Sequence, residues 1–163
     1  MGAGKTTIGR QLAKKLSVSF YDSDHEIENR TGVKISLIFE IEGEEGFRRR
    51  ETQVLRELSE LDNIVLSTGG GALVLAENRE LLKSKGYIIY LKSSPEMLCK
   101  RTADDKRRPL LQGENRLEQI TKILNEREPD YIAMADEIID SEKLSIKQII
   151  QKILKQIEKD ENY

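Results

Sequence analysis

The residues nearest the N-terminus have the types and spacing of a phosphate-binding loop. Gly2-Ala3-Gly4-Lys5-Thr6-Thr7 leads directly into a helical pattern over residues 6–16 and matches the second half of the motif G-x-x-x-x-G-K-[ST]. Glycines let backbone N–H groups approach phosphate oxygens, and a helix N-terminus favours negative charge. In such a loop Lys5 reaches the β- and γ-phosphates of a nucleotide, and the Thr6 hydroxyl binds Mg²⁺. The first glycine of the motif would fall before Met1.

Two carboxylates follow the first strand-like run. Asp22 and Asp24 come just after residues 18–21, and ligands of open α/β sheets bind at the carboxyl ends of strands. One carboxylate there can hold Mg²⁺ through water, and the other can accept a hydrogen bond from a substrate hydroxyl. An N-cap of a helix over residues 26–30 explains the same residues without a ligand. Beside a phosphate-binding loop, the ligand site is the better interpretation.

A glycine run and several arginines extend the candidate site. Gly69-Gly70-Gly71 follows the strand-like run 64–66, and three glycines at a strand end favour a ligand platform over an ordinary turn. Arg48 and Arg127 suit a carboxylate, because a guanidinium can bind two oxygens side by side. A solvated surface position is the alternative for each. Spacing alone does not show which residue of the run Arg48-Arg49-Arg50 points inward.

The elements that position these residues alternate along the chain. Strand-like runs cover residues 18–21, 64–66, 87–91 and 137–139, and helical patterns cover residues 6–16 and 44–61 and begin again at Pro95 and Ser145. This alternation predicts an α/β fold with a parallel sheet flanked by helices. Residues 104–115 are polar and aperiodic, which predicts a mobile loop. No linker or repeat divides the chain, so residues 1–163 are expected to form one domain.

Composition restricts the class of protein. A net charge of −2 over 163 residues disfavours binding to nucleic acid or to a membrane surface, which needs a basic excess. Cys99 is the only cysteine, which excludes an intrachain disulfide and fits a reducing, cytoplasmic setting. No apolar run approaches the roughly 18 residues of a membrane span.

Together these stretches resemble the shikimate kinase family, small P-loop kinases of the nucleoside-monophosphate-kinase type. The resemblance covers essentially the whole chain and rests on motifs in family order: Met1–Arg10, Phe20-Tyr-Asp-Ser-Asp24, Gly46-Phe-Arg48 with Glu51, Thr68-Gly-Gly-Gly71, Arg101-Thr102, Arg108-Pro-Leu-Leu111 and Arg127-x-Pro-x-Tyr131. It implies a three-layer α/β/α fold with a lid near residues 104–115 and a substrate-binding helical region near residues 24–61. It also implies a monomeric cytoplasmic enzyme of aromatic amino acid biosynthesis, which transfers the ATP γ-phosphate to the 3-hydroxyl of shikimate.

The resemblance implies roles for the candidate residues. Shikimate is bound by Asp24, Arg48, Gly70, Gly71 and Arg127, and the nucleotide by Gly2, Ala3, Gly4, Lys5, Thr6, Thr7, Arg101 and Arg108. The catalytic residues are Lys5, Asp24 and Arg108, and one Mg²⁺ is held by Thr6 and Asp22. Within this set, Arg48 and Arg127 clamp the shikimate carboxylate, Glu51 orients Arg48, and Arg108 moves with the lid toward the γ-phosphate. The adenine loop of the family corresponds to the region near residues 140–142. Expected partners are ATP and shikimate, without nucleic acid or membrane.

Two other functions remain open. The same residues suit another small-molecule P-loop kinase, of the gluconate type, or a nucleotide-binding module without kinase activity. The start of the chain favours the module without kinase activity, because it lacks the family's first strand and first loop glycine. We expect about ten residues to be absent when the sequences are aligned on Lys5. Because that strand is central in related sheets, its absence is expected to expose two strand edges.

Overall fold

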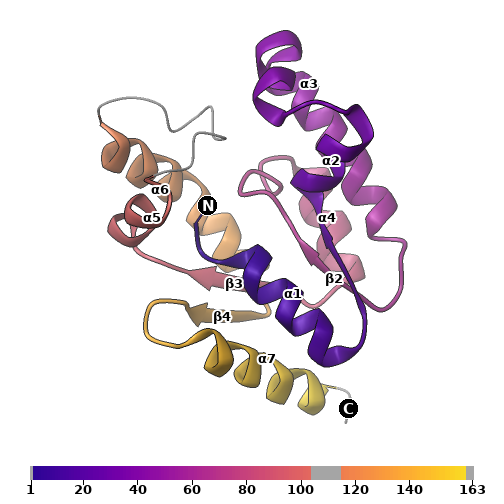
Figure 1. The fold of residues 1–163 in the computed structure, drawn as a ribbon, viewed down its shortest axis with the longest axis vertical. Coiled ribbons are helices and arrows are strands. Elements are labelled where there is room, and N and C mark those ends of the chain that lie inside the picture. Colours follow the sequence, from indigo (N-terminus) through magenta and orange to yellow (C-terminus); the bar gives the residue numbers. More distant parts are fainter. Residues whose placement is uncertain (1, 104–114, 161–163) are drawn as a thin grey trace.

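The computed structural model describes residues 2–103 and 115–160, and Figure 1 shows their arrangement. Arg108 and nearly all of the expected lid lie outside this part of the chain. The elements are α1 (Lys5–Leu16), β1 (Ser19–Asp22), α2 (Ser23–Thr31), α3 (Ile35–Leu58), β2 (Ile64–Ser67), α4 (Ala76–Lys85), β3 (Ile89–Lys92), α5 (Pro95–Arg101), α6 (Arg116–Met134), β4 (Glu137–Asp140) and α7 (Ile146–Asp160).

The four described strands form two parallel pairs. In one pair Ser19 of β1 lies opposite Ile64 of β2, and in the other Ile89 of β3 lies opposite Glu137 of β4. The predicted parallel pairing is confirmed, and the described strands form two separate two-stranded sheets. No ladder of hydrogen bonds joins β2 to β3, and such a ladder requires strands about 4.8 Å apart. Each of these two strands therefore has one edge without a described partner.

Side-chain caps begin two of the helices whose starts the sequence predicts, α5 and α7. Ser94 accepts a hydrogen bond from the Met97 amide at 3.3 Å, with Pro95 in the first turn of α5. Ser145 accepts from the Gln148 amide at 3.2 Å, and the Gln148 side chain accepts from the Ser145 amide at 2.9 Å. This reciprocal pair is a capping box and confirms the predicted start of the last helix.

The remaining helices differ from the sequence expectation. The helical pattern from residue 44 is the second part of α3, which starts at Ile35 and is broken at Gly43, where φ is 68° and ψ −177°. Only glycine adopts such a backbone readily. The helical patterns did not predict α4 or α6, and α6 contains Pro129 in its interior. A proline inside a helix removes a backbone donor, so sequence patterns argue against the helix that forms.

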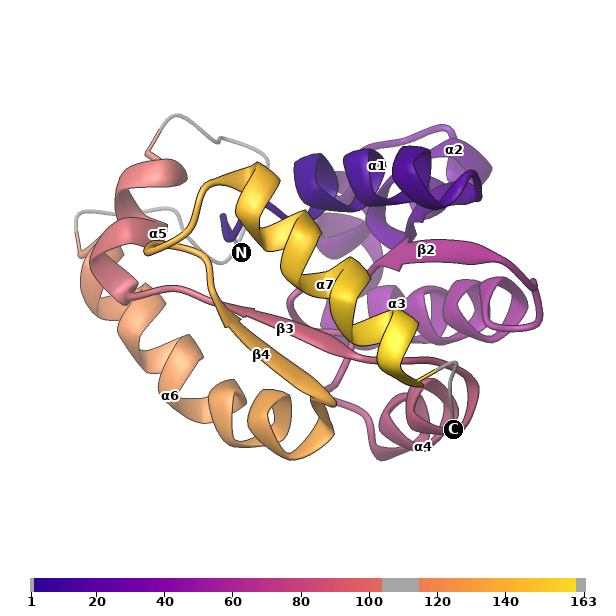
Figure 2. The same ribbon diagram turned by 90° about the horizontal axis from the view of Figure 1, so that it is seen from below.

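Helices lie on both sides of the strands. In Figure 2, α1 lies on one side, and α3, α4 and α6 lie on the other. One apolar core joins α1 and α7 to the strands, and its fully buried members include Ile120, Ile139, Ile149 and Ile153. A second core joins α2 to α3 through Ile27, Ile38, Phe47, Val54 and Leu58. Tyr21 of β1 and Leu66 of β2 pack against the second core. Among the described helices, none is long and apolar enough to cross a membrane.

Candidate active site

The glycine loop enters α1 through two left-handed residues. Gly2 has a φ of 62°, and Gly4, the N-cap of α1, has a φ of 90°. A Cβ on Gly2 would stand 2.8 Å from Thr102 Cγ2, so the loop passes closely over the end of α5. Ala3 between the glycines is buried in the first core. The loop therefore has a fixed path into the helix, with Lys5 and Thr6 in the first turn.

The two residues expected to hold Mg²⁺ lie together. The Thr6 hydroxyl donates to Asp22 Oδ2 at 2.8 Å. The other carboxylate oxygen caps α2, because Oδ1 accepts from the amides of Asp24 and His25 at 3.1 and 3.2 Å. The structure thus shows Asp22 as a helix cap, and its second oxygen lies on Thr6, the other residue expected to hold Mg²⁺. A hydroxyl and a carboxylate oxygen are the hard donors that Mg²⁺ prefers. Among the described residues, no group of three or more His, Cys, Asp or Glu side chains could hold a metal ion.

Arg48 and Glu51 form a buried ion pair on α3. Arg48 Nη1 donates to Glu51 Oε2 at 2.6 Å, and the two side chains are 8% and 1% exposed. Burial lowers the pKa of Arg48, but the charge and hydrogen bonds of Glu51 and Glu44 raise it above the ordinary value. Burial raises the pKa of the Glu51 carboxyl, against the opposing effect of Arg48. The neighbours Arg49 and Arg50 are exposed, so Arg48 is the arginine that points inward.

The glycine run after β2 lies directly on this pair. A Cβ on Gly71 would stand 2.3 Å from Arg48 Nη2 and 2.4 Å from Nη1. A Cβ on Gly69 would stand 2.6 Å from Asp24 Oδ1 and 3.1 Å from Glu51 Oε1. That Glu51 oxygen is buried and has no hydrogen-bond partner. Because these glycines have no side chains, the loop after β2 can pack directly against Asp24 and the Arg48–Glu51 ion pair.

Helix α6 contributes the second predicted arginine. Arg127 lowers the pKa of both Tyr131 and Glu51, while burial raises the pKa of each. The Tyr131 hydroxyl donates to the Gly70 carbonyl. Tyr131 received no role in the sequence analysis, although it closes the motif Arg127-x-Pro-x-Tyr131. All the residues expected to bind the organic substrate thus come from α2, α3, α6 and the loop after β2.

The expected adenine-side residue lies at the other strand pair. Arg101 at the end of α5 donates to Ser141 through Nη1 and Nη2, at 3.5 Å to the hydroxyl and 3.3 Å to the carbonyl. Ser141 follows β4. A Cβ on Gly2 would also lie 3.6 Å from the Arg101 Cβ. The phosphate loop therefore lies between the end of α5 and the carboxyl end of β1, where Thr6 contacts Asp22. Thr7 is exposed on the first turn of α1.

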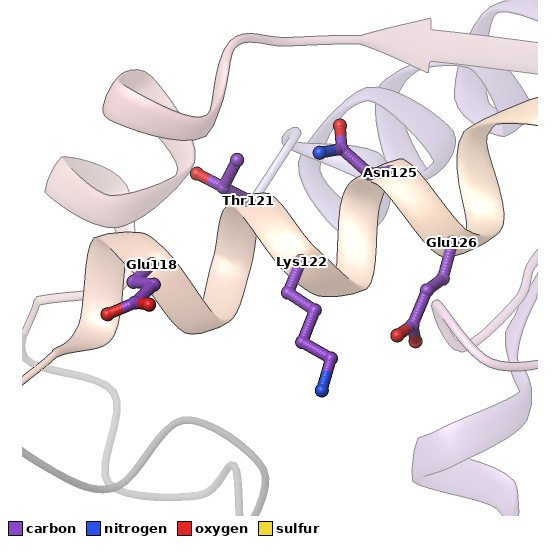
Figure 3. Close-up of a pocket in the computed structure, with 5 residues that line it drawn as sticks. All are labelled: Glu118, Thr121, Lys122, Asn125 and Glu126. Atoms are coloured by element: carbon purple, nitrogen blue, oxygen red, sulfur yellow. The ribbon is translucent and has the colours of Figure 1, made fainter.

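Two surface hollows lie outside this cluster. One, of about 580 Å³, runs along α6 and is lined by Glu118, Thr121, Lys122, Asn125 and Glu126 (Figure 3). The other, of about 470 Å³, lies between α2 and α3 beside the ion pair of Glu42 and Arg50. Neither contains a residue that the sequence analysis assigned to a ligand.

A parallel α/β fold whose glycine loop enters a helix beside a Thr–Asp pair is typical of P-loop nucleotide-binding proteins, the class that contains the P-loop kinases. A family model described as shikimate kinase matches residues 1–158. The chain belongs to this family, and its activity class is that of an ATP-dependent phosphotransferase.

Individual relatives agree with this assignment. The chain is 56% identical over 146 residues to the shikimate kinase of Thiobacillus denitrificans, covering 90% of this chain and 80% of the relative. It is 52% identical over 157 residues to that of Nitrosococcus oceani, covering 96% and 83%. The structure of Acinetobacter baumannii shikimate kinase in complex with shikimate superposes with a TM-score of 0.95 at 49% identity, covering 98% of this chain and 89% of that chain.

Proposed function

We propose that the chain transfers the γ-phosphate of ATP to the 3-hydroxyl of shikimate, giving shikimate 3-phosphate and ADP. The observation that carries this proposal is the buried Arg48–Glu51 pair against Gly71, with Asp24 beside it at Gly69. A buried guanidinium suits a carboxylate, and a nearby aspartate suits a hydroxyl. The similar Acinetobacter enzyme was solved with shikimate bound, which supports the choice of substrate.

The nucleotide side uses the loop at the start of α1. Backbone amides of residues 2–7 and the ammonium of Lys5 bind the phosphates, and Arg101 lies along the adenine near Ser141. Thr6 and Asp22 hold one Mg²⁺, which supplies positive charge to the phosphates when it is bound. The described donors fit this ion, since the Thr6 hydroxyl oxygen and Asp22 Oδ2 lie 2.8 Å apart.

The reaction depends mainly on positioning. Arg48 and Arg127 hold the shikimate carboxylate, and Gly70 and Gly71 contact the ring hydroxyls. Asp24 orients the attacking hydroxyl and accepts its proton. Because the transition state of phosphoryl transfer is loose, alignment and charge stabilisation account for most of the rate. We assign Arg108 to the γ-phosphate and residues 104–115 to a lid; apart from Asn115, these lie outside the described residues.

The wider arrangement follows from the same proposal. We take residues 1–163 as one three-layer domain, whose helical region at residues 24–61 closes on shikimate. Within this region the second core holds α2 against α3. The enzyme acts as a monomer in the cytoplasm, without nucleic acid or membrane as a partner.

The direct test is ADP release in a coupled assay with shikimate, with gluconate and with neither. We expect ADP release that depends on shikimate and on Mg²⁺. Faster release with gluconate would favour a gluconate-type kinase. ATP binding without turnover of either acid would favour the nucleotide-binding module.

Replacing Gly71 by alanine is expected to weaken shikimate binding about five- to tenfold. The new Cβ would stand 2.6 Å or less from three guanidinium atoms of Arg48, so the arginine must move from its position. Calorimetric titration with shikimate measures the change. The control is Gly86→Ala, because a Cβ there meets nothing within 4 Å. Equal affinities for the Gly71 variant and the parent chain would contradict the placement of substrate on Arg48.

A further inference from the structure

A second carboxylate occupies the outer edge of the Arg48 guanidinium. Glu44 Oε1 accepts from Nε at 3.3 Å and from Nη2 at 3.1 Å. Nη1 is held by Glu51 at 2.6 Å, and the backbone of Gly71 lies against both Nη atoms. All three guanidinium nitrogens therefore have a carboxylate partner. The edge formed by Nε and Nη2, which can bind both oxygens of a carboxylate, is the edge that Glu44 covers.

The two carboxylates on Arg48 differ in how tightly they are held. The Glu51 side chain is 1% exposed, whereas the Glu44 side chain is 53% exposed. Water can solvate the half-exposed Glu44 carboxylate when it separates from Arg48, and Arg48 then keeps Glu51 as its partner. Glu44 can therefore leave Arg48 at low cost, while Glu51 stays.

The backbone beside Glu44 allows such a movement. Glu44 is the first residue after the break at Gly43, whose left-handed φ of 68° interrupts α3. On the other side of the break, Glu42 is fastened to Arg50 by hydrogen bonds of 2.9 and 2.7 Å. A Cβ on Gly43 would meet nothing within 4 Å, so the space on that side of the residue is open.

A simpler explanation for Glu44 is that acids favour the first turn of a helix segment. This explanation applies equally to Glu45, which pairs with the exposed Arg49 at 2.7 Å. It does not explain why Glu44 pairs with Arg48, whose side chain is only 8% exposed and lies against Gly71. Glu45 thus offers a matched control for the charge of Glu44.

We propose that Glu44 takes the place of the substrate carboxylate on Arg48 in the empty enzyme and that shikimate displaces it. The proposal rests on the function proposed above, in which Arg48 binds the acid group. Glu44 then acts as an internal competitor: it keeps the guanidinium aligned and lowers the affinity for carboxylate ligands. It sets the affinity for shikimate without taking part in phosphoryl transfer.

The test compares Glu44→Gln with Glu45→Gln by calorimetric titration with shikimate in the absence of ATP. We expect Kd for shikimate to fall about two- to fivefold in Glu44→Gln and to stay unchanged in Glu45→Gln. Glu44→Ala should act in the same direction as Glu44→Gln. A shikimate analogue with a hydroxymethyl group in place of the carboxylate should bind the parent chain and Glu44→Gln equally. Such an analogue does not compete with Glu44 for the Nε and Nη2 groups of Arg48.

Four results would overturn the proposal. Weaker binding of shikimate to Glu44→Gln would show that Glu44 helps Arg48 to bind the substrate. Unchanged binding would show that Glu44 has no effect on the affinity for shikimate. Equal tightening in both glutamine variants would show an effect of net charge alone. Equal tightening of the hydroxymethyl analogue would show that competition for the guanidinium is not the cause. Arg48→Ala separates this proposal from the proposed function, because an unchanged Kd in that variant would remove the assigned role of Arg48 itself.

Discussion

Replacing Arg48 by alanine is expected to raise Kd for shikimate about ten- to a hundredfold and to leave Kd for ATP nearly unchanged. A charge-assisted hydrogen bond to a carboxylate contributes about 1.5–3 kcal/mol, which corresponds to that range. ATP is little affected because the phosphate loop lies on α1, whereas Arg48 lies on α3. Calorimetric titration with each ligand separately measures both constants. A parallel loss of ATP affinity would show a general disruption of the site.

Arg48→Ala is also expected to lower the stability of the fold. A second variant is therefore needed to separate the loss of stability from the loss of shikimate affinity. Without Arg48, the Glu51 carboxylate is left 1% exposed and unpaired, and a broken buried ion pair costs about 3–5 kcal/mol. Arg48→Ala/Glu51→Ala removes the orphaned charge and should recover part of the melting temperature. Its affinity for shikimate should stay low. Recovery of affinity together with stability would mean that Arg48 acts on the fold and not on the substrate.

The loss of stability in Arg48→Ala should depend on pH. Burial raises the pKa of Glu51 even with Arg48 opposing it, so removing Arg48 raises that pKa further. A carboxyl with a higher pKa in the folded state than in the unfolded state binds more protons when folded, so stability rises as pH falls. The gap in melting temperature between the variant and the parent chain should therefore narrow from about pH 8 to about pH 5. A constant gap would show that Glu51 is not the cause of the loss.

Local chemistry explains which parts of the fold the sequence could predict. Ser94, Ser145 and Gly4 act on the backbone within a few residues, so their effects are visible in the chain itself. Helix α6 forms although Pro129 opposes it, because Ile120 and Met134 are buried by distant parts of the chain. The division of the strands into two pairs is likewise a long-range property. Apolar runs predict that strands exist, but not which strands exchange hydrogen bonds.

The candidate site shows the same limit. Spacing did not distinguish Arg48 from its two neighbours, and the distinction comes from the resemblance and from burial beside Phe47 and Glu51. Asp22 caps α2 through one oxygen and contacts Thr6 through the other, so the helix cap and the expected ligand site, which the sequence offered as alternatives, are compatible at this residue. Tyr131 owes its place in the site to a long-range contact with Gly70. Glu44 pairs with Arg48 at the local spacing i,i+4, but Glu45 and Arg49 have the same spacing, so burial of Arg48 is needed to single out Glu44.

The second large effect is expected at Asp22, where two substitutions separate its two roles. Asparagine caps a helix as well as aspartate does, so Asp22→Asn should keep the hydrogen bonds that Oδ1 accepts from Asp24 and His25. It removes the negative charge beside Thr6. We expect the Mg²⁺ concentration for half-maximal ADP release to rise about tenfold or more, with little change in melting temperature.

Asp22→Ala removes the cap as well as the charge and should therefore show the same Mg²⁺ dependence with an additional loss of about 1 kcal/mol in unfolding free energy. Asp62→Asn provides the control, because Asp62 is exposed and the substitution changes net charge equally. If Asp22→Asn needs no more Mg²⁺ than the parent chain while Asp22→Ala is destabilised, Asp22 is a helix cap alone. In that case the hydrogen bond between Thr6 and Asp22 is a structural contact, and the ion must be held by the phosphates and other residues.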